Sequence, residues 1–187
     1  MENLFVNGRE YKIIKLLGHG KGGYSYLAEN SRTLVVLKQI HHEPCDYYQF
    51  GNKIEAEQRD YGRLSAARIK IPKMLDIDLQ NERIVKDYIE GNTIFELVKN
   101  DAMKGEYLAQ VRKMAEKAEN AGINIDYFPT NFVVRKNPEN GEEELFYIDY
   151  ECNDYMEKWN FENWGIKYWS KTKEFLEYLG KSAKLKL

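Results

Sequence analysis

The first half of the chain carries a strand-like pattern of hydrophobic and polar residues. Short runs of β-branched or aromatic residues, broken by glycines, lie at residues 11–17, 24–29 and 33–40. Runs of this length and composition predict strands joined by turns. A charged segment at residues 52–64 predicts a helix, and two more predicted strands follow at residues 73–78 and 83–89. We therefore expect a β-rich region with one helix.

Beyond Gly91 the hydrophobic period becomes helical. Apolar residues recur on one predicted helical face at Leu108, Val111, Met114, Ala115 and Ala118. Gly122 stands where a C-terminal cap is expected. Two short strands at residues 132–134 and 145–148 are separated by the turn-forming residues 137–141, so they predict a hairpin.

The tail from Tyr155 is expected to be helical, with Phe175, Leu176 and Leu179 as its packing stripe. A β-rich first part and an α-rich second part predict an α+β protein with two lobes rather than one sheet. The expected division is residues 1–90 for the first lobe and 91–187 for a reduced, mainly helical second lobe.

Composition narrows the classes of function. With 187 residues the chain can form one buried domain or two small lobes. Its net charge of -2 gives no general reason to expect nucleic-acid or membrane binding, and no apolar run approaches the length of a membrane span. Charges among the first residues argue against a signal peptide. The only cysteines are Cys45 and Cys152, so we expect a cytoplasmic protein.

Gly18, Gly20 and Gly23 form a G-x-G-x-x-G motif with three readings. A dinucleotide-binding turn would open a helix, but a strand pattern follows at residues 24–28. A Walker A loop needs Ser or Thr after Gly-Lys, and Gly22 follows Lys21 here. The motif therefore predicts either a hairpin that covers phosphates or an ordinary glycine-rich hairpin.

Lys38 lies inside an apolar predicted strand. Such a lysine often extends to solvent. The functional alternative is a cation for nucleotide phosphates, held by a carboxylate of the next helix, where Glu55 and Glu57 face different sides. We favour Glu57, because Tyr61 and Leu64 follow it at helical spacing.

The second half carries a sharper signal in Asp126, Asn131 and Asp149. Asp126 and Asn131 form D-x-x-x-x-N directly before one predicted hairpin strand, and Asp149 ends the other. Separately, these residues would be ordinary turn and strand-end residues. Together they predict an oxygen-rich site suited to Mg²⁺, with one carboxylate as base and an Asn and an Asp as metal ligands.

The order of these motifs resembles the protein-kinase superfamily from about Leu17 to Glu151. It is most similar to compact atypical kinases, such as the RIO kinases and the small kinase of the tRNA-modifying KEOPS complex, and to aminoglycoside and choline kinases. The resemblance implies a two-lobed kinase-like fold and the cofactors ATP and Mg²⁺. It implies that Gly18, Gly20 and Gly23 cover the phosphates, and that backbone groups of Asp87 and Ile89 bind adenine.

The resemblance also assigns the chemistry. Lys38 would position the phosphates, Glu57 would orient Lys38, Asp126 would be the catalytic base, and Asn131 and Asp149 would bind the metal. The chain departs from the family at several positions. Asn124-Ile125 precedes Asp126 in place of the usual His or Arg, Tyr150-Glu151 replaces Phe-Gly, and Lys86 stands at the position that gates the adenine pocket.

The predicted function is an ATP-dependent kinase resembling serine/threonine kinases, with a protein or small-molecule hydroxyl as acceptor. Only a short segment follows Glu151, which leaves little room for a peptide platform. A small-molecule acceptor of the aminoglycoside or choline type is therefore an alternative, and a pseudokinase acting as a binding module is another. The acidic and aromatic tail is either a cation site or a core patch: Asp154, Tyr155, Glu157, Trp159, Glu162 and Trp164.

The sequence also bears on other partners. A basic C-terminus with Lys181, Lys184 and Lys186 fits RNA association or a solvated helix end, and we do not expect nucleic acid to be the main partner. No membrane contact is expected, whereas an additional protein partner fits so small a second lobe.

Overall fold

The computed structural model describes residues 3–44 and 51–184. The chain forms two compact units, residues 1–61 with 72–88 (unit 1) and residues 62–71 with 89–187 (unit 2). Cys45 and Lys186, named above, lie outside the described residues. None of the helices in the described ranges has the length and apolar character needed to cross a bilayer.

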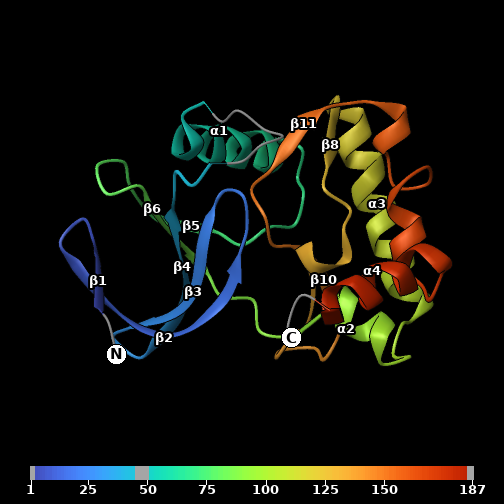
Figure 1. The fold of residues 1–187 in the computed structure, drawn as a ribbon, viewed down its shortest axis with the longest axis horizontal. Coiled ribbons are helices and arrows are strands. Elements are labelled where there is room, and N and C mark those ends of the chain that lie inside the picture. Colours follow the sequence, from blue (N-terminus) through green and yellow to red (C-terminus); the bar gives the residue numbers. More distant parts are fainter. Residues whose placement is uncertain (1–2, 45–50, 185–187) are drawn as a thin grey trace. The chain divides into compact units, whose positions relative to one another are not determined.

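Unit 1 is a twisted antiparallel sheet with a helix after its fourth strand (Figure 1). The sheet order is β1-β2-β3-β4-β6-β5. The elements are β1 (Asn3–Val6), β2 (Arg9–His19), β3 (Gly23–Asn30), β4 (Thr33–Ile40), α1 (Lys53–Ala66), β5 (Met74–Asp78) and β6 (Arg83–Asp87). The last turn of α1, from residue 62, belongs to unit 2. The strands predicted from the apolar runs are confirmed, whereas β1 was not predicted from the sequence.

One core cluster of unit 1 is formed by residues of neighbouring strands. Its buried members are Val6, Tyr11, Ala28, Val35, Leu37 and Val85. Ile40, Ile54 and Ile84 are also buried in this unit. β3 and β4 pair without a break from Gly23–Ile40 to Asn30–Thr33, which fixes which face each β4 side chain occupies. Lys38 therefore lies at a defined position near the end of β4.

In the part of the chain that the structure describes, unit 2 combines α-helices with two small sheets (Figure 1). Its elements are β7 (Asn92–Thr93), α2 (Ile94–Lys99), α3 (Gly105–Asn120), β8 (Ile123–Ile125), η1 (Pro129–Asn131), β9 (Phe132–Lys136), β10 (Glu143–Tyr147), β11 (Cys152–Asp154), η2 (Glu157–Trp159), η3 (Gly165–Tyr168) and α4 (Lys173–Lys184). β10 and β7 flank β9 in one sheet, and β11 pairs with β8 in the other. The predicted hairpin is the β9–β10 pair.

The helical pattern of α3 is confirmed, since Val111, Met114 and Ala118 are buried. Gly122 follows the end of this helix with φ +69°, and its N–H donates to the carbonyl of Glu119 at 2.8 Å. A glycine adopts this left-handed conformation without the strain that a Cβ would add. Gly122 therefore ends α3 as predicted.

The expectation of a helical tail from Tyr155 is wrong for its first part. Two short 3₁₀ turns, η2 and η3, precede α4, which begins only at Lys173. The expected stripe is also partly wrong: Phe175 is buried, but Leu176 is 50% exposed. Aromatic residues at irregular spacing, including Phe161 and Trp169, form the core of this segment instead.

Candidate functional site

Lys38 on β4 and Glu57 on α1 form an ion pair within unit 1. Each side chain is only 12% exposed. Glu57 shares a helical face with the buried Ile54, three residues earlier, whereas Glu55 is exposed. The helical spacing therefore selected the correct partner, while the catalytic roles of the two residues stay predictions.

The glycine-rich loop lies directly against this ion pair. A Cβ at Gly22 would lie 3.4 Å from Nζ of Lys38 and 3.5 Å from Oε1 of Glu57. The second oxygen of Glu57, Oε2, is buried and has no hydrogen-bond partner among the described residues. The ion pair therefore places the Lys38 ammonium group and the Glu57 carboxylate beside the main chain of the glycine-rich loop.

Close packing explains one of the three glycines of the motif and not the other two. Gly23 begins β3, and a Cβ there would lie 2.3 Å from the carbonyl oxygen of Gln39, so strand packing itself excludes a side chain. A Cβ at Gly18, near the end of β2, or at Gly20, in the loop, would meet no atom within 4 Å. Packing therefore explains Gly23 and leaves Gly18 and Gly20 unexplained by the fold.

Lys53 at the start of α1 holds this loop in place, a role that sequence reasoning missed. Its side chain is buried, and Nζ donates to the carbonyl of Lys21 at 3.0 Å and to that of His41 at 2.6 Å. A lysine is rarely buried without such partners. In the sequence Lys53 is one of many charges on a charged helix, so no signal distinguished it.

The expected adenine-binding residues lie at the end of β6 and just beyond it. The N–H of Asp87 donates to the carbonyl of Lys73 at 3.0 Å, so a ligand would have to use the Asp87 carbonyl or the main chain of Ile89. Ile89 belongs to unit 2, where its side chain packs with Val133 and Phe146. Lys86, on β6, is 6% exposed.

Two strand pairs bring the polar residues of unit 2 together. β8 pairs with β11 through Ile125 and Cys152, so Asp126 and Glu151 extend from the same end of this ladder. β9 pairs with β10 through Phe132 and Tyr147. Just beyond that pair, Ile148 donates its N–H to the carbonyl of Asn131 at 2.8 Å. Asn131 is thereby adjacent to the main chain that leads into Asp149.

Hydrogen bonds to backbone groups hold the side chains of Asp126, Asn131 and Asp149 at the ends of these strands. Asp126 Oδ1 accepts from the N–H of Phe128 at 3.0 Å, and Asp149 Oδ1 accepts from the N–H of Tyr150 at 2.9 Å. The side-chain amide of Asn131 donates to the carbonyl of Asp126 at 3.4 Å. The D-x-x-x-x-N spacing is thus bridged by the 3₁₀ turn η1, which returns Asn131 to Asp126.

Tyr147 joins the two ladders and was missed as a site residue. Its hydroxyl donates to the carbonyl of Glu151 at 2.8 Å and accepts from the N–H of Asp126 at 3.3 Å. Burial raises the pKa of the Tyr147 phenol well above its usual value, and the charges of Asp149, Asp126 and Glu151 raise it further. The phenol therefore stays protonated. In an apolar strand this tyrosine looked like a core residue.

The tail supports the loop after Asp126 from within the core of unit 2. Trp169 is 1% exposed, and its indole N–H donates to the carbonyl of Tyr127 at 2.8 Å. A Cβ at Gly165 would lie 2.5 Å from Cβ of Tyr127, so this close approach requires glycine. Trp169 and Gly165 were both missed, because nothing in their spacing points to residues some forty positions earlier.

One departure from the kinase pattern, at Asn124, has a local explanation. Asn124, which stands near the position of the usual His or Arg, is 5% exposed, and its side-chain oxygen accepts from the N–H of Met156. It therefore ties β8 to the segment after β11. In the tail, Asp154 pairs with Arg63 and Glu162 pairs with Arg112.

The sequence matches no protein-family model and no curated protein. Among solved structures, the chain is similar to the BubR1 kinase domain, with a TM-score of 0.55 and 18% sequence identity. The match covers 84% of this chain and 52% of that one, so the chain spans about half the length of the solved domain. The similarity shows that the chain has a protein-kinase-like fold.

Proposed function

We propose that the chain is an ATP- and Mg²⁺-dependent phosphotransferase, resembling serine/threonine kinases, in which units 1 and 2 are the N- and C-lobes. The single observation that carries the proposal is the ion pair of Lys38 and Glu57. A lysine with an exposed fraction of 12%, held by a glutamate of the neighbouring helix, is a cation of fixed position. Kinases use such a cation to hold nucleotide phosphates.

The glycine-rich loop supports the same function. Gly18 and Gly20 have no neighbouring atoms that exclude a side chain, so the fold alone does not require glycine there. A loop without side chains lets main-chain N–H groups approach phosphate oxygens closely. The loop main chain at Gly22 also lies beside the lysine that would bind the phosphates.

In unit 2 the donor set fits magnesium. Mg²⁺ prefers carboxylate and carbonyl oxygens and keeps several waters. Asn131 donates from its side-chain nitrogen to Asp126, so its side-chain oxygen is the atom left to bind a cation. We assign Asn131 and Asp149 as the magnesium ligands; the bound ion would neutralise charge on the phosphate oxygens.

Asp126 is the proposed base. It accepts the proton of the acceptor hydroxyl as that oxygen forms a bond to the γ-phosphorus, while the bond from the γ-phosphorus to the β,γ-bridging oxygen breaks and ADP leaves. The N–H of Phe128 binds one oxygen of the Asp126 carboxylate, which orients the other. The main-chain N–H of Asp126 donates to the hydroxyl of Tyr147, which holds the backbone of the proposed base.

A protein hydroxyl is the acceptor we favour over a cationic alcohol. The tail acids Asp154 and Glu162 are already in ion pairs with arginines. Nζ of Lys158 lies 5.4 Å from the centre of the Trp159 ring. A second cation at this ring would be repelled, so the half-exposed tryptophan is a poor cation site.

The first test is the thermal shift of the full chain with Mg-ATP, comparing wild type with Asp149→Asn. We expect stabilisation that requires both magnesium and Asp149, since a ligand that binds only the folded state raises its stability. Absence of any shift for the wild type would contradict the nucleotide site.

The second test measures release of ADP and labelling of the chain itself with γ-labelled ATP. Asp126→Ala should retain the Mg-ATP thermal shift and lose transfer by about 10²–10⁴-fold, the usual contribution of a positioned base. Transfer that survives in Asp126→Ala would refute the assigned base. Binding with no transfer even by the wild type would favour the alternative, a pseudokinase that serves as a binding module.

A further inference from the structure

A cluster of two histidines and a glutamate lies on the glycine-rich loop, outside the residues assigned above. His19 is the last residue of β2 and stands between Gly18 and Gly20, whereas His41 and Glu43 follow β4. One ligand atom from each side chain can be chosen so that all three lie within 4.8 Å of one another. Among the described residues this is the only such group of His, Cys, Asp or Glu side chains.

We propose that His19, His41 and Glu43 bind a divalent transition-metal ion of the zinc class. Two imidazoles and one carboxylate are a donor set for zinc, which accepts three protein ligands and a water molecule. Mg²⁺ prefers an all-oxygen set, so this site is distinct in chemistry from the magnesium ligands of unit 2. The proposal concerns unit 1 alone and does not rest on the proposed kinase activity.

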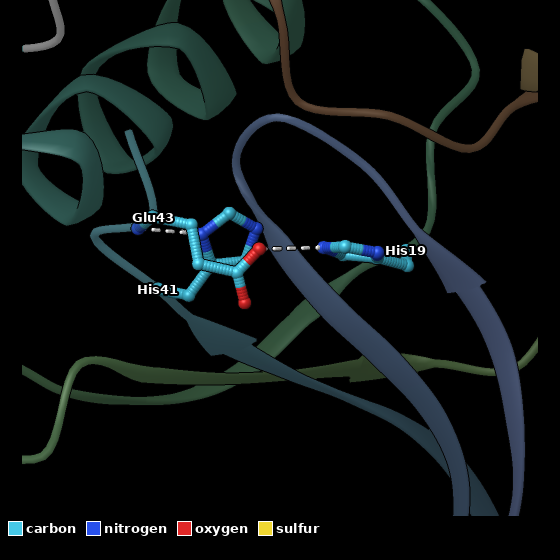
Figure 2. A group of neighbouring side chains, drawn as sticks. All are labelled: His19, His41 and Glu43. Carbon is cyan, nitrogen blue, oxygen red and sulfur yellow. Dashed lines mark hydrogen bonds and ion pairs between the residues drawn. The ribbon is translucent and has the colours of Figure 1, made fainter. Parts of the chain in front are cut away.

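The spacing of the first two ligands fits the ion. Nε2 of His19 and Oε2 of Glu43 lie 3.3 Å apart, and Figure 2 shows the Glu43 side chain directed towards the His19 ring. Two atoms held about 2.0–2.1 Å from a tetrahedral ion are roughly 3.3 Å from each other. The side chains of His19 and Glu43 are 46% and 49% exposed, so an ion can reach them and they can adjust around it.

The hydrogen bonds of His41 fix which of its nitrogens can bind. Nε2 faces the carbonyl of Gly20 at 2.9 Å, and because a carbonyl only accepts, Nε2 carries the proton. Nδ1 then has the lone pair, which accepts the N–H of Glu43 at 3.2 Å before an ion binds (Figure 2). An ion at Nδ1 would take the place of this hydrogen bond. Metal-binding histidines are commonly oriented in this way, with the other nitrogen bound to a backbone carbonyl.

Other residues hold the cluster together before any ion binds. The Tyr24 ring stacks on His19 with centroids 4.3 Å apart, and its hydroxyl donates to Glu43. Lys53 binds the carbonyls of Lys21 and His41, which joins the loop to the segment after β4. Such supporting contacts lower the cost of assembling the ligands, as in known metal sites.

A bound ion would connect the glycine-rich loop to the segment after β4 by direct ligand bonds. Loops of this kind open locally at low free-energy cost, and a cross-link raises that cost. The consequence is a loop whose mobility depends on metal. We expect Zn²⁺ to slow amide hydrogen exchange at residues 18–23, and to leave α3 in unit 2 unchanged.

The test is calorimetric titration of the tag-free, chelator-treated full chain with Zn²⁺. We expect one ion per chain, with binding lost in His19→Gln, His41→Gln and Glu43→Gln. His42→Gln is the matched control, because His42 is adjacent to the cluster yet binds Glu82 at 2.6 Å instead. Tyr24→Phe removes only a supporting bond and should weaken binding by about tenfold.

Cobalt substitution identifies the ligands by spectroscopy. Co²⁺ at this site should give the visible d–d bands of a four-coordinate ion without a thiolate charge-transfer band, and His42→Gln should give the same spectrum as the wild type. A thiolate band would assign the ion to a cysteine and overturn the proposal. Absence of zinc binding by the wild type, or equal binding by wild type and His19→Gln, would also overturn it.

Discussion

The two units hold their proposed functional residues in different ways. In unit 1, Lys38 and Glu57 come from a strand and a helix, and their side chains hold each other. In unit 2, Asp126 and Asp149 extend from strand ends, and main-chain N–H groups bind their carboxylates. Position in unit 1 therefore depends on a pair of charges, whereas in unit 2 it depends on the backbone.

This difference determines where substitutions should affect stability. A charge removed from unit 1 leaves its partner in a largely buried place, which costs free energy. A carboxylate removed from unit 2 leaves the ladders intact, because Tyr147 and Trp169 support the loops from the core. The residues that stabilise the unit 2 site are thus not the residues proposed to perform its chemistry.

The largest effect is expected for Trp169→Ala. The indole is 1% exposed and lies with its ring centroid 5.0 Å from Phe132 and 5.3 Å from Phe161. Removing a buried aromatic ring usually lowers the free energy of unfolding by about 3–5 kcal/mol. Urea denaturation followed by circular dichroism measures this loss, and Asp149→Asn should change the same quantity by less than about 1 kcal/mol.

Trp169→Phe is the matched control that separates the packing of the aromatic ring from the indole hydrogen bond. It keeps an aromatic side chain and leaves the carbonyl of Tyr127 without its donor, so a smaller loss of about 1–3 kcal/mol is expected. Equal losses for Trp169→Ala and Asp149→Asn would mean that the core does not support the loop as described.

The second prediction concerns Gly165, which packs against the residue after Asp126. A Cβ here would lie 2.5 Å from Cβ of Tyr127 and 2.9 Å from Cδ2 of Phe161, so Gly165→Ala must displace one of them. Overpacking of this kind costs about 1–3 kcal/mol. Gly105→Ala is a control with open space around its Cβ. A similar melting temperature for both variants would contradict the close approach.

Much of the fold could be predicted from the local sequence pattern. The strands of unit 1 are either alternating apolar and polar residues or continuous apolar runs, and turn-forming residues separate them. The first part of the tail did not follow. Its aromatics, such as Phe161 and Trp169, have no helical or strand period, since they pack on loops rather than on one face of a regular element. β8 and β11, each of three residues, are too short for a periodic signal.

The candidate site was predictable where chemistry requires particular side chains in a particular order. Lys38, Asp126, Asn131 and Asp149 are such residues, and the partner Glu57 followed from helical spacing. Lys53, Tyr147 and Trp169 could not be found in this way. Each acts on a main-chain carbonyl or N–H, and a backbone partner leaves no signature in the sequence.

The third prediction tests the mutual dependence of Lys38 and Glu57. Lys38→Met should lower the free energy of unfolding by about 2–3 kcal/mol, because it leaves the Glu57 carboxylate largely buried without its cation. Lys38→Met combined with Glu57→Gln should restore part of this loss. A double-mutant cycle in urea measures the coupling, and simple additivity would show that the pair does not hold its members in place.

Unit 1 also contains a carboxylate that binds backbone N–H groups, and the fourth prediction concerns this residue. Asp78 is 4% exposed and accepts from the side chain and N–H of Asn81 and from the N–H of Asn7. These bonds, the side chain of Asn81 first, lower the pKa of Asp78 from 3.8 to about 2.

Because the folded-state pKa of Asp78 lies below the unfolded value, its contribution is complete above pH 3.8 and disappears as the pH falls through about 2. The loss is at most about 2.5 kcal/mol. Unfolding free energies measured between neutral and acid pH should show this dependence in the wild type. Asp78→Asn should be less stable at neutral pH and less sensitive to acid; an unchanged acid response would refute the assignment.

The smallest effect is expected at a surface pair of unit 2. The hydrogen bond from Lys104, and then that from the hydroxyl of Tyr107, lower the pKa of Glu143 from 4.5 to about 2. The contribution of the Glu143 carboxylate to stability is therefore also present above pH 4.5 and lost as the pH falls through about 2. The Lys104 side chain is 52% exposed, so solvent and salt screen the pair, and Lys104→Met should lower the free energy of unfolding only slightly. Raising the salt concentration should reduce this cost while leaving the Asp78 contribution in place, because neutral N–H donors bind Asp78. If salt weakened the Glu143 and Asp78 contributions equally, charge attraction rather than hydrogen bonding would hold the turn from Asp78 to Asn81.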